Sequence, residues 1–381
     1  MIIIISIILF MLFFLMSNRK NRTLFTSLSI TLFAGILLLT NGQFEYNDYP
    51  EYLKLFIGHQ GSVYGDLDVE NGYELEKPYA YFNYIVRFFL PRMAYSYILC
   101  YGLMWILPIR SLLKKGSYCV PLSLFLICSF LNCSQLLFII TAQRQMIANV
   151  AILWAYYIFQ YTNYKKKKKV ILIVTLLTIA LLSHSSSYFV IPLLPILYII
   201  KFPPKKYIIV IMLLSLFFGP TVQNFFRPIF YGLMIQLGSG DEIARSTTYY
   251  INDIYEAGTG NINSLLPSTA VGIVLVYFYS KEELKSYGAK LISFSVIAYN
   301  LFNSVPLINR ALMIFFVLGM ILGIPNYSKN TRLFKLSLVF VGSMLIYTAI
   351  KYGYLNGGEN NRLFPYPYIW ENPTPFKIYD V

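Results

Sequence analysis

The sequence predicts an all-α, polytopic membrane protein whose helices cross the bilayer about twelve times. Two observations lead to this fold class. Of the 381 residues, 57% are hydrophobic and 13% are charged, whereas about 25% of the residues in a soluble domain are charged. Apolar runs also recur at close to the length of about 20 residues that a spanning helix needs, and no stretch between them is long enough for a soluble domain. We therefore expect residues 1–381 to form a single transmembrane domain.

The expected spans follow the apolar runs in chain order. We expect the first run to be a retained helix and not a signal peptide, because its basic cluster follows the apolar residues instead of preceding them. An aromatic stretch at residues 79–90 is too short to span and suits a half-helix lying in the membrane interface. The twelve spans are placed at residues 1–16, 23–40, 94–112, 119–139, 143–161, 170–187, 188–200, 207–222, 263–280, 291–305, 309–324 and 336–350.

The positions of Lys and Arg predict the orientation of these spans, because basic residues concentrate in cytoplasmic loops. Every second connection is basic: six connections hold 20 of the 31 basic residues and only two acidic ones, Glu282 and Glu283. The opposite side keeps 11 basic and 15 acidic residues. We therefore expect both termini on the non-cytoplasmic side. The net charge of +14 is then a topology signal and not a nucleic-acid-binding surface.

Three long segments are expected on the non-cytoplasmic side. They are residues 41–91, which include the interfacial half-helix, residues 222–263, and the C-terminal tail 351–381. The inner connections are little more than short basic turns. Although any single loop residue can simply belong to a solvated connection, the size and acidity of the outer segments make the outer face the expected place for chemistry.

Polar residues lie at the outer ends of three expected spans. Arg144 and Gln145 begin the fifth span, His184 closes the sixth, and Arg310 begins the eleventh. A charged side chain at the centre of a bilayer costs about 2.5–3.5 kcal/mol on insertion scales, so such residues usually face a cavity and function there. Asp48, in the first outer segment, is expected at the same membrane depth.

Each of these residues also has an ordinary structural interpretation. Arg144 and Arg310 can extend their guanidinium groups toward lipid headgroups at the membrane surface. His184 can be a hydrogen-bonded packing residue, and Asp48 suits a turn before Pro50. Taken together, however, the four residues bring a carboxylate, an imidazole and two guanidinium groups to one membrane depth.

This set of groups suits glycosyl transfer from a polyprenyl-diphosphate donor. Guanidinium groups bind phosphate oxygens in a bidentate way and stay charged, and they can stabilise the charge that develops on a diphosphate leaving group. A carboxylate or an imidazole can accept the proton of the attacking hydroxyl. We expect no cofactor and no metal centre, because the chain has two histidines, no Gly-rich phosphate loop, and four cysteines in or beside spans.

In their order and spacing, several short motifs resemble the EpsG-like family of Wzy-type membrane polysaccharide polymerases. The resemblance covers roughly residues 40–325. It rests on an Asp-Tyr-x-x-Tyr in the outer loop, an acidic residue before an aromatic half-helix, an Arg-Gln pair, a His followed by serines, and a late Arg that begins a helix. These residues are Asp48, Tyr49, Tyr52, Glu76, Arg144, Gln145, His184 and Arg310. The first outer loop is longer and more acidic than the family pattern leads us to expect.

The resemblance implies a GT-C-like membrane glycosyltransferase architecture and a multi-pass enzyme of the bacterial cytoplasmic (inner) membrane, with its active site facing the periplasm or exterior. Such an enzyme moves a glycan from undecaprenyl diphosphate onto a hydroxyl of another lipid-linked repeat unit, and so builds O-antigen, capsule or exopolysaccharide without a metal. The implied partners are undecaprenyl-diphosphate-linked oligosaccharide, membrane lipid and a chain-length regulator.

The resemblance also implies residue roles. Asp48, His184 and Glu76 are the catalytic candidates, with Asp48 or His184 as the base and Glu76 as the third choice. The diphosphate or glycan is expected to be bound by Arg144, Arg310, Gln145, Tyr49 and Tyr52.

Two other functions share this membrane frame. One is a polyprenyl-monophosphate-dependent glycosyltransferase that adds a single sugar, with Asp48 as its catalytic or metal-binding carboxylate. The other is a flippase or transporter of lipid-linked oligosaccharides. Transporters often contain internal repeats and broken helices at the midplane, whereas this sequence has no convincing internal repeat and its polar residues gather at the outer ends of spans.

Overall fold

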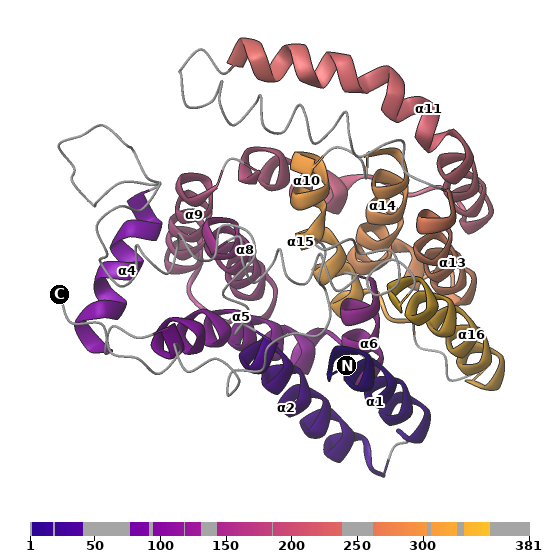
Figure 1. The fold of residues 1–381 in the computed structure, drawn as a ribbon, viewed down its shortest axis with the longest axis horizontal. Coiled ribbons are helices and arrows are strands. Elements are labelled where there is room, and N and C mark those ends of the chain that lie inside the picture. The colour runs from indigo at the N-terminus through magenta and orange to yellow at the C-terminus, as the bar shows by residue number, and fades with distance from the viewer. Residues whose placement is uncertain are drawn as a thin grey trace. The chain divides into compact units, whose positions relative to one another are not determined.

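The computed structural model is all-helical over the residues that it describes, with thirteen α-helices, one short 3-10 helix and no strand (Figure 1). This confirms the all-α fold class. The residues described are 2–17, 20–40, 77–90, 94–117, 119–130, 143–184, 186–237, 262–302, 306–325 and 331–350.

A helix lies in each expected span, although residues 131–139 of the fourth span lie outside the described residues, and one further helix matches the aromatic half-helix. The helices up to residue 199 are α1 (Ile2–Met16), α2 (Arg22–Thr40), α4 (Lys77–Phe89), α5 (Ala94–Gly116), α6 (Val120–Phe130), α8 (Gln143–Tyr161), α9 (Lys166–Ser183) and α10 (Ser187–Ile199). The remainder are α11 (Lys205–Leu237), α13 (Ile262–Phe278), η2 (Glu283–Lys285), α14 (Tyr287–Phe302), α15 (Pro306–Leu322) and α16 (Thr331–Ile350).

The C-terminal end of α11 lies well beyond the position expected from the sequence. This helix is 33 residues long and continues to Leu237, so the first part of the segment 222–263, expected as an outer loop, is helical. Gln223, Asn224 and Arg227 lower the local hydropathy, which suggests the end of a span. Residues such as Gln and Arg are nevertheless good helix formers, so the helix continues where the apolar run stops.

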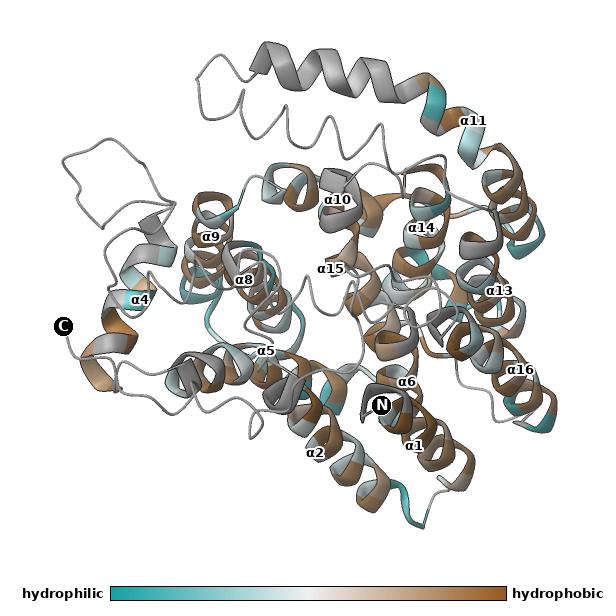
Figure 2. Ribbon diagram, in the orientation of Figure 1, coloured by the Kyte–Doolittle hydropathy of each residue, from teal (hydrophilic) through white to brown (hydrophobic). Residues whose placement is uncertain are grey.

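The described surface is strongly apolar. Phe88 is 79% exposed, Phe217 63% and Phe340 68%, and Figure 2 shows hydrophobic residues along most of the helical ribbon, with hydrophilic ones at places such as the turn between α1 and α2. Contiguous apolar surface of this kind is rare on soluble monomers. The helical composition is therefore consistent with an α-helical membrane protein.

Fewer helices are long enough to span a bilayer than the sequence predicts. Within the described ranges, one helical stretch, Lys205–Val222, is both long and apolar enough to cross a bilayer. Shorter apolar helices cover Ile5–Met16, Arg22–Ile36, Ser187–Ile199, Leu265–Phe278 and Ala311–Leu322. The number of crossings, the side of each terminus and the GT-C-like architecture stay predictions.

The helices form two compact units, one of Met1–Ile191 with Ala349–Val381 and one of Pro192–Thr348. In the first unit α1 packs against α2 and α6, α5 packs against α8, and α8 packs against α9, with α4 in contact with both α8 and α9 (Figure 1). Its core consists of apolar side chains with almost no exposed surface, including Phe10, Phe14, Leu112, Leu124, Phe125 and Leu153.

In the second unit α14 contacts α11, α13 and α15. Glycines allow the closest approach: Gly288 lies against the carbonyl group of Leu322, and a Cβ atom at Gly319 would come within 3.1 Å of Ile292 Cγ1. Small residues of this kind let helix backbones approach in membranes, where burial of apolar surface gives little driving force. Close packing of the two backbones at these glycines therefore stabilises the α14–α15 contact.

A buried amide links three helices of the same unit. The side chain of Asn300, on α14, donates to Ser215 Oγ on α11 at 3.0 Å and to Thr269 Oγ1 on α13 at 2.9 Å. In a membrane interior such interhelical hydrogen bonds satisfy polar groups that hydrocarbon cannot. Gly219 of α11 lies directly against the backbone oxygen of Asn300. This close approach of α11 and α14 allows the Asn300 amide to reach Ser215.

Candidate functional site

One face of helix α4 is buried in the protein, and the opposite face exposes apolar side chains. Tyr79, Asn83 and Val86, spaced at four and three residues, are buried, whereas Phe88 and other apolar side chains on the opposite face are exposed. Tyr101 of α5 donates a hydrogen bond from its hydroxyl to Asn83 Oδ1 at 2.8 Å. The arrangement fixes α4 to the unit and leaves an apolar face outward, as expected for a half-helix in the membrane interface.

Helix α8 carries Arg144 and Gln145 in its first turn. The helix begins at Gln143, and the buried side chains of Gln145 and Asn149 lie one turn apart on the same face. Arg144 is placed in the helix by its backbone, and its side chain lies outside the described residues. The first backbone N–H groups of a helix and the helix dipole generally favour an anion near a helix N-terminus.

His184 follows the last residue of α9 and is half-buried. Its Nδ1 accepts a hydrogen bond from the backbone N–H of Ser186 at 3.1 Å and lies 2.8 Å from Ser186 Oγ. A backbone N–H can only donate, so Nδ1 is the acceptor and the neutral ring carries its proton on Nε2. In this tautomer the imidazole is a hydrogen-bond donor at Nε2 and is not ready to accept a proton there.

The first turn of α8 and the end of α9 lie at the same end of a helix pair. The two helices pack against each other and are joined by only four residues, 162–165, so they run antiparallel (Figure 1). Arg144 and His184 are consequently at one end of the pair. The five lysines of the segment 165–169 are at the other end.

The structure does not describe the side chains of the remaining predicted site residues. Asp48, Tyr49, Tyr52 and Glu76 lie outside the described residues. Arg310 is placed on α15 by its backbone, in the unit Pro192–Thr348. The structure therefore brings together the first turn of α8 and His184, and it leaves the roles of the acidic candidates as predictions.

Sequence reasoning missed the partners that orient the polar groups. Ser186 fixes the ring of His184, and Tyr101 fixes Asn83 of α4. The first has a recognisable signal, because a Ser two residues after a His at a helix end can bond back to the ring. The second has none, since α4 and α5 meet through tertiary packing. Among the described residues, no group of three or more His, Cys, Asp or Glu side chains could hold a metal ion.

Comparison with known proteins assigns the family. No match was found among the curated proteins or among the solved structures. The family described as the EpsG family matches residues 26–368, a range that includes most of α2, all later helices to α16, and every candidate residue from Asp48 to Arg310. With nine-tenths of its length matched in this way, the chain belongs to the EpsG family.

Proposed function

We propose that this protein is a membrane glycosyltransferase that polymerises lipid-linked oligosaccharide repeat units at the outer leaflet of the bacterial cytoplasmic membrane. Membership of the EpsG family indicates a polysaccharide-polymerase-type role. The finer statement names the substrate as a glycan on a polyprenyl diphosphate such as undecaprenyl diphosphate, and the acceptor as the non-reducing-end hydroxyl of a second lipid-linked unit.

The observation that carries the proposal is the clustering of Arg144 and His184 at one end of the α8–α9 pair, with the lysines 165–169 at the other. Since basic connections mark the cytoplasmic side, the opposite end of the pair belongs to the outer side. A cation and a hydrogen-bond donor at that depth are suited to the diphosphate of a lipid-linked donor.

In the proposed reaction the acceptor hydroxyl oxygen attacks the anomeric carbon of the donor glycan. A new C–O bond forms, the bond from that carbon to the diphosphate oxygen breaks, and undecaprenyl diphosphate leaves with the bonding pair. Arg144 binds the diphosphate and stabilises its developing charge, and Arg310 is the second residue predicted for this role. Tyr49, Tyr52 and Gln145 contact the sugars or the diphosphate.

The hydrogen bonds around His184 favour one division of roles among the catalytic candidates. Because Nδ1 accepts from the Ser186 amide, His184 supplies a donor at Nε2 to an oxygen of the donor substrate. A carboxylate is then needed to accept the proton of the attacking hydroxyl. Asp48 takes that role in the proposal, and Glu76 is the second candidate.

The test is complementation of a strain that lacks the chromosomal copy. Arg144→Ala and His184→Ala should leave the protein level in the membrane unchanged but abolish long-chain polymer, with glycan chain lengths measured on gels. The matched control is Lys167→Ala, an exposed residue at the opposite end of the same helix pair. This variant should give normal chains.

The same gels separate the alternatives. Single repeat units on the final acceptor are the expected product of a polymerase defect. Loss of one branch sugar with normal chain length would point instead to a transferase that adds a single sugar, and accumulation of repeat units on the cytoplasmic side would point to a flippase. Normal polymer in both variants would contradict the proposal.

A further inference from the structure

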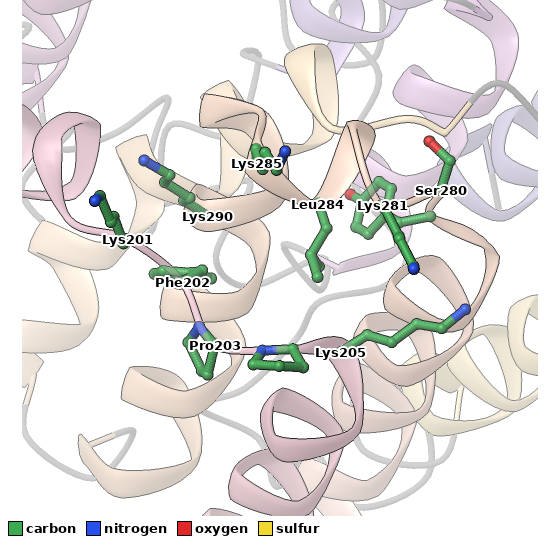
Figure 3. A pocket seen from close by; sticks show the side chains of 11 residues that line it. Lys201, Phe202, Pro203, Lys205, Ser280, Lys281, Leu284, Lys285 and Lys290 are labelled. Atoms are coloured by element: carbon green, nitrogen blue, oxygen red, sulfur yellow. The ribbon is translucent and has the colours of Figure 1, made fainter.

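A basic pocket lies between two connections of the unit Pro192–Thr348. One wall is the connection from α10 to α11 with the start of α11, and the other is the connection from α13 to α14 with the first turns of α14 (Figure 3). The cavity has a volume of about 740 Å³. Its cationic residues are Lys201, Lys205, Lys281, Lys285 and Lys290, and the rest of its wall is largely apolar.

The two acidic residues nearby offset only part of the positive charge of the five lysines in this basic pocket. Glu282 pairs with Lys285 at 3.1 Å, but both side chains are more than two-thirds exposed, at 83% and 73%, so the pair contributes little. Glu283 Oε2 accepts the backbone N–H of Ser280 at 2.8 Å and so closes the turn. Neither glutamate lines the cavity.

Two of the lysines are held in place by backbone carbonyl groups. Lys290 is only 8% exposed, and its Nζ donates to the carbonyl of Tyr198 at 2.8 Å. Lys205 Nζ donates to the carbonyl of Tyr277 at 3.1 Å. Among the described residues no carboxylate pairs with either lysine. A buried ammonium group without a counter-charge is costly, so an anion in the cavity would be stabilised.

A phenol helps to fix this geometry. The hydroxyl of Tyr287, at the start of α14 and ahead of the span expected at 291–305, donates to the carbonyl of Leu194 at 3.2 Å. Burial raises the pKa of Tyr287 above its ordinary value, so the group stays a neutral donor. Helix α10 and the first turn of α14 are thereby joined independently of any ligand.

The apolar part of the pocket indicates an amphiphile. Phe202 and Leu284 point into the space between the two connections, with lysine side chains around them (Figure 3). Just outside, Ile199 and Tyr207 expose apolar surface next to the basic residues. A small inorganic anion would use only the ammonium groups, whereas a lipid would use both the charged and the apolar surface.

We propose that this pocket binds the phosphate-bearing headgroup of an anionic membrane lipid. Both connections belong to the basic set that is expected on the cytoplasmic side, and basic pockets between helices on that side suit anionic lipid headgroups. The site is separate from the proposed diphosphate site of Arg144 and does not depend on the polymerase function.

The experiment measures the dissociation constant of short-chain phosphatidylglycerol for the purified full-length protein in a neutral detergent. Lys205→Gln combined with Lys281→Gln should weaken binding about 25-fold, because a lysine near an anionic headgroup is worth about fivefold in affinity. The matched control, Lys166→Gln with Lys167→Gln, removes the same charge from exposed positions of α9. It should change the affinity less than about twofold.

Further arms identify the ligand and guard against misfolding. Replacing Lys205 and Lys281 by Arg keeps the charge and should keep the affinity, and both pairs of variants are compared by size-exclusion profile. Short-chain phosphatidylcholine should bind far more weakly than phosphatidylglycerol, and so should pyrophosphate. Pyrophosphate binding as tight as that of the lipid, or equal weakening by the two Gln pairs, would overturn the proposal.

Discussion

At the scale of single residues, the backbone around His184 determines what its side chain can do. The ring follows the end of α9, and the chain then turns so that the amide of Ser186 reaches Nδ1. Only one tautomer of the neutral imidazole fits this bond. An imidazole held in this way is a fixed donor, which is better suited to binding a diphosphate or glycan oxygen than to removing a proton.

Ser186 is accordingly a positioning residue. Ser186→Ala removes the 2.8 Å contact between Ser186 Oγ and His184 Nδ1. It keeps the hydrogen bond from the backbone N–H of residue 186 to the ring. The loss of one hydrogen bond, about 0.5–1.5 kcal/mol, should slow polymerisation about twofold to tenfold. The rate is measured as chain extension per unit time at equal protein level, and Ser186→Thr should restore it.

The control for this prediction is Ser183→Ala. Ser183 Oγ donates to the carbonyl of Ile179 within α9, so its removal should leave chain extension within about twofold of the unaltered protein. If Ser186→Ala and Ser183→Ala extend chains equally fast, Ser186 does not position His184.

At the scale of helices, small residues determine how closely neighbours pack. A Cβ atom at Gly288 would collide with the backbone of Leu322, an obstacle that cannot rotate away as a side chain could. By contrast, nothing lies within 4 Å of the position that a Cβ would take at Gly35, on α2. Both glycines lie in apolar helices, but only Gly288 lies against the backbone of a neighbouring segment.

Gly288→Ala should therefore lower the free energy of unfolding by about 1–3 kcal/mol, the usual cost of overpacking. Gly35→Ala should be neutral or stabilising by up to about 1 kcal/mol, because Ala is the better helix former. Thermal unfolding of the purified protein in detergent compares the two. A Gly288→Ala protein as stable as Gly35→Ala would show that α14 and α15 do not pack this closely.

The positions of the helices could be predicted from the sequence, whereas their contacts could not. Apolar runs are a local property, so a helix lies in each expected span, with residues 131–139 of the fourth outside the described residues, and α4 matches the aromatic half-helix. The end of α11 was missed because polar residues such as Gln223 interrupt an apolar run without ending a helix. The bond from Ser186 to His184 and the approach of Gly288 to Leu322 depend on how the chain packs, which local patterns do not encode.

At the scale of the whole molecule, charge separates along the chain. The basic connections are expected to carry +18 and the other side −4, which together give the net charge of +14. The division stays a prediction, and the structure shows where several of the basic connections lie. The lysines 165–169 and His184 lie at opposite ends of the α8–α9 pair, and the connections around Lys201 and Lys281 line one pocket. The acidic candidates Asp48 and Glu76 lie outside the described residues.

Reconstitution shows most directly whether this chain alone joins lipid-linked repeat units. Purified protein is placed in liposomes with undecaprenyl-diphosphate-linked repeat units from the same cells, without nucleotide sugars, and the products are separated by length. We expect a ladder of longer glycans with release of undecaprenyl diphosphate, and no ladder with Arg144→Ala or His184→Ala. Repeat units that stay single with the unaltered protein, or a ladder that both variants still produce, would contradict it.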